Sequence, residues 1–437
     1  MSGEHPSQKD KPHVVIIGGG FAGLACALKL RRAPVRVTLI DRQNYHLFQP
    51  LLYQVATGGL SPANIATPLR KIVGRCSNVQ VLLGEVTAID VARRAVAVAG
   101  HEIGYDYLVV AAGAENAYFG HDEWERHAPG LKSIEDATAI RGKILRAFER
   151  AEFVSDPDEI RHLLTFVIIG AGPTGVELAG AISEIARHTL RHEFRTINPE
   201  DARIILVDHS DRVLPPYPEG LSEAARTMLT ELNVEVRNGL RVTDISAGSV
   251  TVTWDGGEER IAAATVLWAA GVGASPLGER LADSAGLDLE KGGQVPVGDD
   301  LSIDGYPEVF VVGDMASARD ESGAPLPGVA PVAAQQGTYV AGCIRDYLAG
   351  RQTMPFRYLD AGMASTIGRG KAVARIFGLP LKGAIAWLAW LFIHLMKLVS
   401  FENRLLVLIQ WAWNYTTWNR GARLITGRHD DRDSGRA

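Results

Sequence analysis

The sequence contains only three cysteines, and they are far apart. Cys26, Cys76 and Cys343 form no CxxC pair, which excludes a redox dithiol of that kind and a cysteine zinc site. The scarcity of cysteine suits a reducing, cytoplasmic setting.

The sequence also lacks a basic stretch interleaved with aromatic residues. With a formal net charge of −5 over 437 residues, it gives no sign of nucleic-acid binding. The first 13 residues, MSGEHPSQKDKPH, are polar and contain no apolar h-region, so we expect no signal peptide. A hydrophobic content of 46% indicates a globular chain, long enough for two or three domains.

What the sequence does contain is one local pattern twice, HVVIIGGGFAGLACAL at 13–28 and TFVIIGAGPTGVELAG at 165–180. Each is an apolar run typical of a buried parallel strand, followed by a glycine turn and a helical pattern. The glycines are Gly18, Gly20 and Gly23 in the first copy and Gly170, Gly172 and Gly175 in the second. Glycine allows a tight turn, backbone contact with a pyrophosphate and close helix packing, and the helix N-terminus attracts phosphate. Two copies predict two dinucleotide sites.

An acid ends the next strand in each copy. Asp41 ends VRVTLID and Asp208 ends ARIILVD, where a carboxylate can accept hydrogen bonds from ribose hydroxyls. Asp208 would repel a 2′-phosphate, which favours NADH over NADPH, although Arg212 lies near enough to relax this preference. Two dinucleotides on one chain indicate a flavin and a nicotinamide working face to face.

Three further runs lead into glycine: LVVAAGA (108–114), TVLWAAGVGA (265–274) and EVFVVGDMA (308–316). The third places Asp314 at a strand tip. In this order the motifs resemble those of the two-dinucleotide flavoprotein reductases, in which an NAD-binding domain is inserted into an FAD-binding domain. DRQNYHLFQPLLYQVATGGLSPANIATPLR (41–70), GVAPVAAQQGTYVAG (328–342) and the tryptophan-rich C-terminal segment resemble, more closely, the type II NADH dehydrogenases, which are NADH:quinone oxidoreductases.

This resemblance extends from about residue 13 to residue 425. It implies an α/β fold with two Rossmann-like domains, FAD in the first, NADH in the second, and a membrane quinone as electron acceptor. The expected domains are 11–158 and 286–350 for FAD, 159–285 for NADH, and 351–437 as a membrane-associating region with a charged tail. Without an array of membrane-spanning segments, no proton pumping is expected.

The resemblance also implies the contact residues. FAD would be held by Gly18, Gly20, Phe21, Ala22, Gly23, Asp41, Arg42 and Asp314. NADH would be held by Gly172, Thr174, Gly175, Asp208 and Gly271. Glu177 and Gln335 match the polar pair near the nicotinamide, flavin and quinone, as both catalytic candidates and cofactor contacts. Many relatives have a Gln four residues before Gln335, where this chain has Pro331, so no role carries over to that position.

Glu177 distinguishes the two copies, because the first copy has Ala25 at the matching position. An acid in a first helical turn can simply stabilise the helix dipole, by about 0.3–1 kcal/mol. That helix end must also accept a pyrophosphate, however, so we expect Glu177 to face the flavin ring and to tune NADH, quinone or proton traffic. Gln335 is favoured over Gln336 as the flavin or quinone contact, and facing water is the alternative.

The helix of the second copy is expected to run on through AGAISEIARHTLRHEF (179–194). Within it His188 and His192 share a face, with Glu184 and Glu193 close by. No third ligand is evident, so we expect a solvated helix face and no metal site.

The C-terminal part is apolar and basic. Residues 383–401 are interrupted only by His394 and Lys397, residues 404–425 are tryptophan-rich, and residues 369–428 hold nine lysines and arginines against one acid, a net charge of +8. We expect two helices within about 380–425 to lie on the lipid bilayer, on the cytoplasmic face of the inner membrane. The alternatives are one span over 384–401, and a buried hairpin or homodimer interface.

Two other functions remain open. One is a soluble NADH-dependent reductase of a ferredoxin-like protein, which the apolar C-terminus disfavours. The other is an NADH-binding flavoprotein that acts as a redox sensor, which slow turnover with every quinone would favour. Disulfide reductases are disfavoured because no cysteine pair lies near the flavin motifs.

Overall fold

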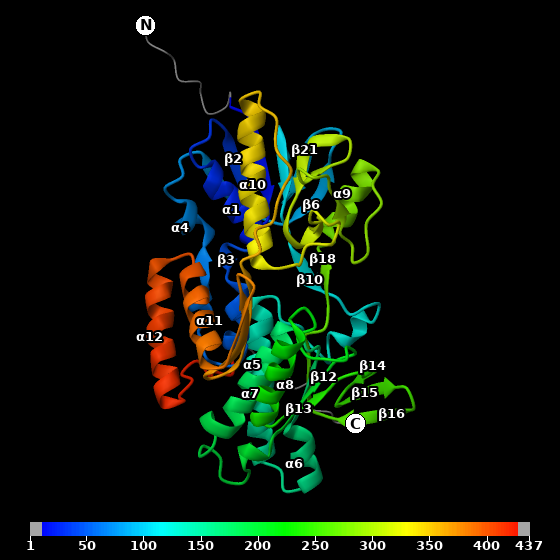
Figure 1. The fold of residues 1–437 in the computed structure, drawn as a ribbon, viewed down its shortest axis with the longest axis vertical. Helices are drawn as coiled ribbons and strands as arrows, with labels where there is room; N and C mark the ends of the chain where they lie inside the picture. The colour runs from blue at the N-terminus through cyan, green and yellow to red at the C-terminus, as the bar shows by residue number, and fades with distance from the viewer. Residues whose placement is uncertain (1–10, 427–437) are drawn as a thin grey trace. The chain divides into compact units, whose positions relative to one another are not determined.

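A computed structural model describes residues 11–426 of the chain. The predicted charged tail at 427–437, and most of the polar N-terminal stretch, lie outside the described residues. The chain divides into two compact units (Figure 1). The first takes the described part of Met1–Leu47 with Ala66–Glu115 and Val272–Leu359, and the second takes Phe48–Ile65, Asn116–Gly271 and the described part of Asp360–Ala437.

The first unit is built on a sheet with the strand order β20-β21-β9-β1-β2-β5. Its strands are Ser302–Ile303, Tyr306–Val311, Tyr107–Val110, His13–Ile17, Arg36–Asp41 and Val79–Leu83, in that order. All neighbours are parallel except β20 and β21. The central strand β1 is buried along its whole length, as a parallel strand covered on both faces should be.

Helices α1 (Phe21–Leu30) and α10 (Ala330–Leu348) pack against each other in this unit (Figure 1). Their backbones approach closely, since a Cβ on Gly337 would lie 2.0 Å from the Ala22 carbonyl oxygen. Helix α10 begins at Ala330, so Pro331 lies in its first turn, where the missing N–H of proline costs no hydrogen bond. A small antiparallel sheet completes the unit with β6 (Val86–Asp90), β7 (Ala95–Val98), β8 (His101–Gly104) and the adjoining α9 (Leu277–Ala285).

The second unit contains a parallel sheet of order β13-β12-β11-β17. Its strands are Val234–Arg237, Arg203–Val207, Thr165–Ile169 and Thr265–Trp268. It also holds the antiparallel sheet β14 (Arg241–Ser246), β15 (Ser249–Trp254) and β16 (Gly257–Ala262), with helices α5 (Ile134–Glu152), α6 (Pro157–Leu163) and α8 (Glu219–Glu231). A capping box between Ser133 and Asp136 begins α5, satisfying N–H groups that a helix start leaves free.

Helix α7 (Pro173–Glu184) follows β11 and is shorter than predicted. It gives way to a π-helical turn, Ile185–Thr189, and does not reach residue 194. Glu184 and Thr189 both bind residues after α12, Arg420 and Trp418, and single π-helical turns of this kind are frequent at functional sites. Prediction of one continuous helix was therefore wrong.

The C-terminal part of the second unit is an antiparallel sheet followed by two helices. Strands β23 (Gly362–Gly368), β24 (Lys371–Ile376) and β25 (Leu379–Lys382) precede α11 (Ala384–Lys397) and α12 (Phe401–Thr417) (Figure 1). The two predicted helices are thus present. Within residues 11–426, no helix combines the length and apolar character needed to cross a bilayer.

Short elements complete the two units. They are β3 (Tyr45–Leu47), β4 (Ala66–Pro68), β10 (Ala114–Asn116), β18 (Val272–Ala274), β19 (Val295–Pro296), β22 (Ala316–Ser317), α2 (Leu52–Ala56), α3 (Pro62–Ile65), α4 (Leu69–Val73) and the 3₁₀ turns Gln49–Leu51, Asp122–Trp124, Pro199–Asp201 and Gly313–Met315.

Candidate functional site

The first glycine turn joins β1 to α1 and has the sterics of a dinucleotide cradle. Gly18 has a φ of 100°, a conformation that favours glycine. A Cβ on Gly23 would lie 1.8 Å from the Gly18 carbonyl oxygen, so only glycine lets α1 start this close to the strand. A Cβ on Gly20 would meet nothing within 4 Å. Open space therefore faces the backbone where a pyrophosphate would approach.

The second turn, between β11 and α7, has nearly the same backbone angle and the same close approach of its glycines. Gly170 has a φ of 104°. A Cβ on Gly175 would lie 1.8 Å from the Gly170 carbonyl oxygen, and one on Gly172 would meet nothing within 4 Å. The two turns therefore have equivalent cradles, each at the N-terminus of a helix with free N–H groups.

The two strand-end acids close the turns in the same way. Asp41 Oδ2 accepts a hydrogen bond from the Gly19 N–H at 2.5 Å, and Asp208 Oδ2 accepts one from the Ala171 N–H at 2.5 Å. Their other oxygens accept from Gln43 and Ser210. Burial raises the pKa of Asp41. The N–H groups of Gln43 and Gly19 and the charges of Arg42 and His46 act in the opposite direction and lower this pKa.

The surroundings of Asp208 also bear on nucleotide choice. Arg212 donates through Nη2 to the Pro215 carbonyl at 2.9 Å. Its guanidinium is therefore engaged within its own loop.

Asp314 lies on the 3₁₀ turn after β21, in the first unit. Its carboxylate makes no side-chain hydrogen bond to any residue of 11–426, while its carbonyl accepts from Gln294 at 3.1 Å. The neighbouring Gly313 N–H donates to Gln336 Oε1 at 2.6 Å. Gln336 is buried and ties this turn to α10, a structural role that sequence reasoning missed.

Gln335 is held by the backbone in the first unit. Its Nε2 donates to the Leu359 carbonyl, and its Oε1 accepts from the Leu359 N–H, both at 3.0 Å. Leu359 is the last residue of that unit before the chain enters the second at Asp360. In this structure the Gln335 amide therefore secures the point where the chain leaves the first unit.

The other predicted FAD contacts lie around the first turn. Phe21 contacts the His46 ring edge-on, with centroids 5.1 Å apart, and Ala22 is buried beneath α10. Arg42 forms an exposed ion pair with Glu115 at 2.9 Å.

Of the remaining NADH residues, Thr174 is half-buried in the first turn of α7. Gly271 accepts a hydrogen bond from the Ala117 N–H at 3.1 Å. A Cβ on Gly271 would lie 2.5 Å from the Phe119 ring, so glycine makes room for that ring.

Glu177 lies in the second unit, one turn into α7. Burial raises the pKa of its carboxyl well above the ordinary value, despite an opposing contribution from the Thr366 N–H. The Glu177 side chain as a whole is half-buried. A carboxyl of this kind can hold a proton at a pH where an exposed glutamate would lose it.

Comparison with known proteins identifies the family. The family model of the pyridine nucleotide-disulphide oxidoreductases matches residues 12–337. The chain is 48% identical over 432 residues to the type II NADH:quinone oxidoreductase Ndh of Mycobacterium tuberculosis, covering 97% of this chain and 92% of that protein. The chain belongs to the type II NADH:quinone oxidoreductases of this family.

One further relative and one solved structure are also similar to this chain. The demethylphylloquinone reductase NdbB of Synechocystis is 30% identical over 412 residues, covering 92% of this chain and 96% of that protein. The structure of NDH2 from Plasmodium falciparum in complex with NADH matches with a TM-score of 0.87 at 18% identity, covering 95% of this chain and all of that chain. The latter shows a shared α/β dinucleotide-binding fold. The two glycine cradles fit FAD and NADH, the cofactor and substrate of this family.

This oxidoreductase has a pocket in its second unit. One face of α7 presents Glu177, Ala181 and Glu184 to it, at successive turns of the helix. Further lining comes from α12 and α2, through Trp411, Asn414, Tyr415, Tyr53 and Gln54, and the end of β23 and the turn after it contribute Thr366–Arg369. Aromatic walls with a few polar groups are typical of small-molecule sites.

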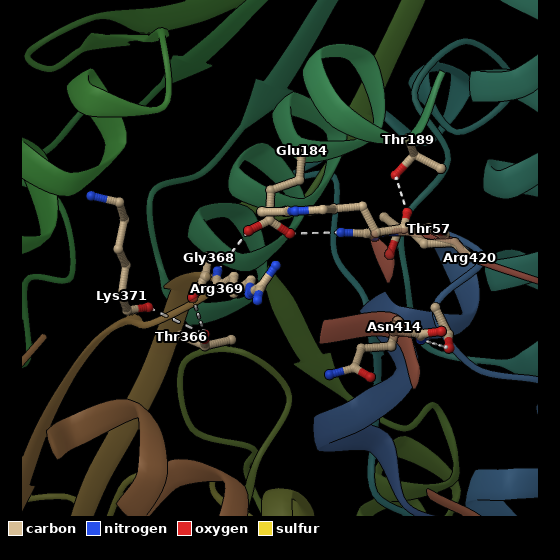
Figure 2. Close-up of polar contacts among 12 residues, drawn as sticks. Thr57, Glu184, Thr189, Thr366, Gly368, Arg369, Lys371, Asn414 and Arg420 are labelled. Carbon is tan, nitrogen blue, oxygen red and sulfur yellow. Dashed lines mark hydrogen bonds and ion pairs between the residues drawn. The ribbon is translucent and has the colours of Figure 1, made fainter. Parts of the chain in front are cut away.

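Glu184 was predicted to lie on a solvated helix face, and that prediction was wrong. Its carboxylate is 2.7 Å from Arg420 and accepts the Arg369 N–H at 2.6 Å (Figure 2). His188 instead packs on the Trp418 ring. Residues 11–426 contain no group of three side chains suited to a metal ion. The available sequence signal was that Glu184 shares a helix face with Glu177, seven residues apart.

Proposed function

We propose that this chain oxidises NADH and reduces a membrane quinone through bound FAD, without pumping protons. The observation that carries the proposal is the doubled cradle, two strand–turn–helix sites with equivalent sterics and an acid closing each turn. The relatives named above supply the direction, because both act on quinones by name. When bound, FAD would accept hydride from NADH and deliver two electrons to the quinone.

We propose the following roles for the residues. The first turn, with Asp41, Asp314 and Gly20, would bind FAD, and the second, with Asp208 and Gly172, would bind NADH. Each turn offers backbone N–H groups and a helix dipole to the pyrophosphate. The carboxylate of Asp208 would disfavour the extra phosphate of NADPH, and the Arg212 guanidinium is engaged with the Pro215 carbonyl in its own loop.

We propose that quinone enters the pocket beside Glu177. Trp411 and Tyr415 would flank its ring, and polar groups would meet its carbonyl oxygens. Trp411 donates through Nε1 to Gln54 Oε1 at 2.7 Å, which fixes the indole plane. Glu177 lines the same pocket, and its carboxyl would hold or release a proton as the quinone is reduced.

We propose that α11 and α12 rest on the lipid bilayer surface. The supporting observation is a set of large apolar side chains that the protein leaves exposed on these helices: Ile385, Leu388, Phe392, Met396, Phe401, Leu405, Leu406, Leu408, Ile409 and Trp413. Such a surface exceeds what scattered exposed residues explain. Since α12 also supplies Trp411 and Tyr415 to the pocket, a lipid-soluble quinone would have a short route to it.

The polar residue His394 on α11 and the basic charge of the C-terminal part agree with a lipid-facing position. His394 turns inward, where its Nδ1 lies 2.8 Å from the Trp390 carbonyl oxygen. Burial lowers its pKa to about 4, so it is uncharged at neutral pH. The basic excess of residues 369–428 favours the anionic lipid of the cytoplasmic leaflet. The proposed location is therefore the cytoplasmic face of the inner membrane.

A homodimer that buries this apolar surface is the competing arrangement. Flotation with vesicles and light scattering in detergent distinguish the two arrangements. Lipid binding by a monomer supports the position on the bilayer, whereas a detergent-resistant dimer that fails to float supports the homodimer.

The function is tested by purification with bound flavin and NADH oxidation with and without a short-chain quinone. Quinone should be reduced in step with NADH oxidation. Rapid reduction of a ferredoxin but of no quinone would contradict the proposal, and slow turnover with every acceptor would favour a sensor.

A further inference from the structure

The segment after α12 folds back onto the end of α7, and Trp418–Arg423 is here called the clasp. Trp418 ends α12 with a φ of 59°, a left-handed conformation that reverses the chain. Its ring contacts the Arg369 guanidinium, 4.6 Å from the ring centroid, and the His188 ring at 4.1 Å. Thr189 donates to its carbonyl at 3.2 Å. The clasp thus begins by packing on the π-helical turn that extends α7.

Arg420 carries the buried ion pair of the clasp. Its Nη2 lies 2.7 Å from Glu184 Oε2, and the two side chains are only 13% and 9% exposed. Its Nη1 donates to the Thr57 carbonyl at 3.3 Å. Figure 2 shows the guanidinium reaching the carboxylate at the end of α7. Removing one partner of a pair this enclosed is costly, because it leaves the other charge buried alone.

Glu184 joins the clasp to a third segment. Its Oε1 accepts the backbone N–H of Arg369, in the turn between β23 and β24, at 2.6 Å. A Cβ on Gly368 would lie 2.9 Å from the same oxygen, so glycine leaves the carboxylate room. One carboxylate therefore fixes the end of α7, the β23–β24 turn and the clasp relative to one another.

Arg423 reinforces the clasp from its other end. Its two terminal nitrogens lie 2.6 and 2.8 Å from the two oxygens of Glu193. Its Nε donates to the Arg420 carbonyl at 2.9 Å, which couples the two arginines. A Cβ on Gly58 would lie 2.9 Å from the Arg423 side chain, so this loop also packs tightly on the clasp.

We propose that Arg420 is a positioning residue for quinone reduction. Through Glu184 it fixes α7 and α12 at one end of the pocket and so sets the spacing between Glu177 and the aromatic wall of α12. Glu177 lies seven residues before Glu184, about 10 Å along the same helix. The inference rests on the proposed function, since it takes this pocket as the quinone site.

NADH binding should be insensitive to the clasp. The NADH turn lies at the opposite end of α7 and is fixed by Gly170, Gly175 and Asp208. None of these contacts involves the clasp. Weakening the clasp should therefore separate two reactions, leaving electron input from NADH intact and impairing electron output to quinone.

The variants are Arg420→Gln, Arg420→Lys, Arg423→Gln and the double variant Glu184→Gln/Arg420→Gln. The double variant leaves no unpaired buried charge, and Arg423→Gln loosens the clasp without touching the buried pair, so the test survives misfolding of Arg420→Gln. The control is Arg161→Gln, which removes an ion pair with Asp158 whose side chains are 71% and 83% exposed. The full-length flavin-loaded proteins are assayed with ferricyanide and with a short-chain quinone, and amide hydrogen exchange is followed over 185–189 and 418–423.

We expect Arg420→Gln to raise the KM for quinone, or lower kcat with quinone, by about tenfold or more, because small displacements of a reacting group are costly. Its NADH KM and ferricyanide rate should match those of Arg161→Gln. Arg420→Lys should recover much of the quinone rate, Arg423→Gln should show a smaller defect, and the double variant should share the quinone defect without the loss of stability.

Faster exchange at the clasp accompanied by unchanged quinone kinetics would overturn the proposal. Equal losses with both acceptors would do the same, because they would indicate general damage. Amide hydrogen exchange measures the order of the clasp without any substrate, so the two proposals can fail separately. Wild-type protein that never reduces quinone refutes the proposed function. Unchanged hydrogen exchange in Arg420→Gln refutes the clasp itself.

Discussion

The twin glycine turns allow each cofactor assignment to be tested by adding one methyl group. In Gly175→Ala the new Cβ starts 1.8 Å from the Gly170 carbonyl oxygen, whereas ordinary contact begins near 3.4 Å. The start of α7 must then withdraw by about 1.6 Å. An N–H that would bind phosphate at about 2.9 Å then lies about 4.5 Å away, beyond hydrogen-bonding reach.

The loss can be estimated from general magnitudes. One hydrogen bond to a charged group is worth about 1.5–3 kcal/mol, so the Kd for NADH should rise by roughly 10- to 100-fold. Overpacking adds a stability loss of about 1–3 kcal/mol. Gly23→Ala has the same clash in the first turn and should instead lower the amount of flavin that copurifies.

Matched controls come from glycines with free space. Cβ atoms on Gly220, in α8, and Gly342, in α10, would meet nothing within 4 Å, so Gly220→Ala and Gly342→Ala should be neutral or slightly stabilising. The assays are flavin absorbance per protein and NADH titration of flavin reduction. Gly175→Ala protein that loses flavin and keeps its NADH affinity would refute the assignment of the two turns.

Three further predictions concern single side chains. For Glu177, a pKa raised by burial means that the folded state holds a proton that the unfolded state releases, so wild-type stability should fall relative to Glu177→Gln as pH rises above about 4.5. Melting temperatures of the two proteins that run parallel across pH would contradict this expectation. An unchanged KM for quinone in Glu177→Gln would remove the proposed role of Glu177. Asp208→Asn should improve kcat/KM with NADPH relative to NADH, and an unchanged ratio would show that Asp208 does not discriminate. The Phe392 side chain is 65% exposed on α11, and the control Phe153 is 90% exposed on the loop after α5. Phe392→Ser should weaken flotation with vesicles more than Phe153→Ser does. Equal flotation of the two variants would argue against lipid binding by the α11 surface.

The strand–turn–helix units could be predicted because their causes are local. The buried run before Gly18 and the contact between Gly18 and Gly23 arise within about ten residues of chain, and the same holds for Gly170 and Gly175. Sterics of this kind leave a sequence signature wherever they occur. The closing acids, Asp41 and Asp208, were also predictable as strand ends, although their bonds to the turn N–H groups were not.

Features that depend on distant partners were not predictable. Arg420 is 236 residues from Glu184, and nothing near either residue signals the pair. The C-terminal helices show the same limit, because they were expected to lie on the bilayer from their composition alone. Trp390 and Trp411 are instead buried and lie 5.7 Å apart between α11 and α12. A single sequence shows which face of a helix is apolar but not what covers it.

The difference between Ala25 and Glu177 follows from how the two equivalent helices are used. Helix α1 is pressed against α10, where Gly337 allows contact with the Ala22 backbone. Helix α7 is pressed instead against β23, because a Cβ on Gly180 would lie 1.7 Å from the Ile367 carbonyl oxygen. That contact immobilises α7 from one side and leaves the face of Glu177, Ala181 and Glu184 on the pocket. The second copy therefore has an open helix face on which acids can act, and Gly180→Ala should disturb the pocket while leaving the NADH turn in place.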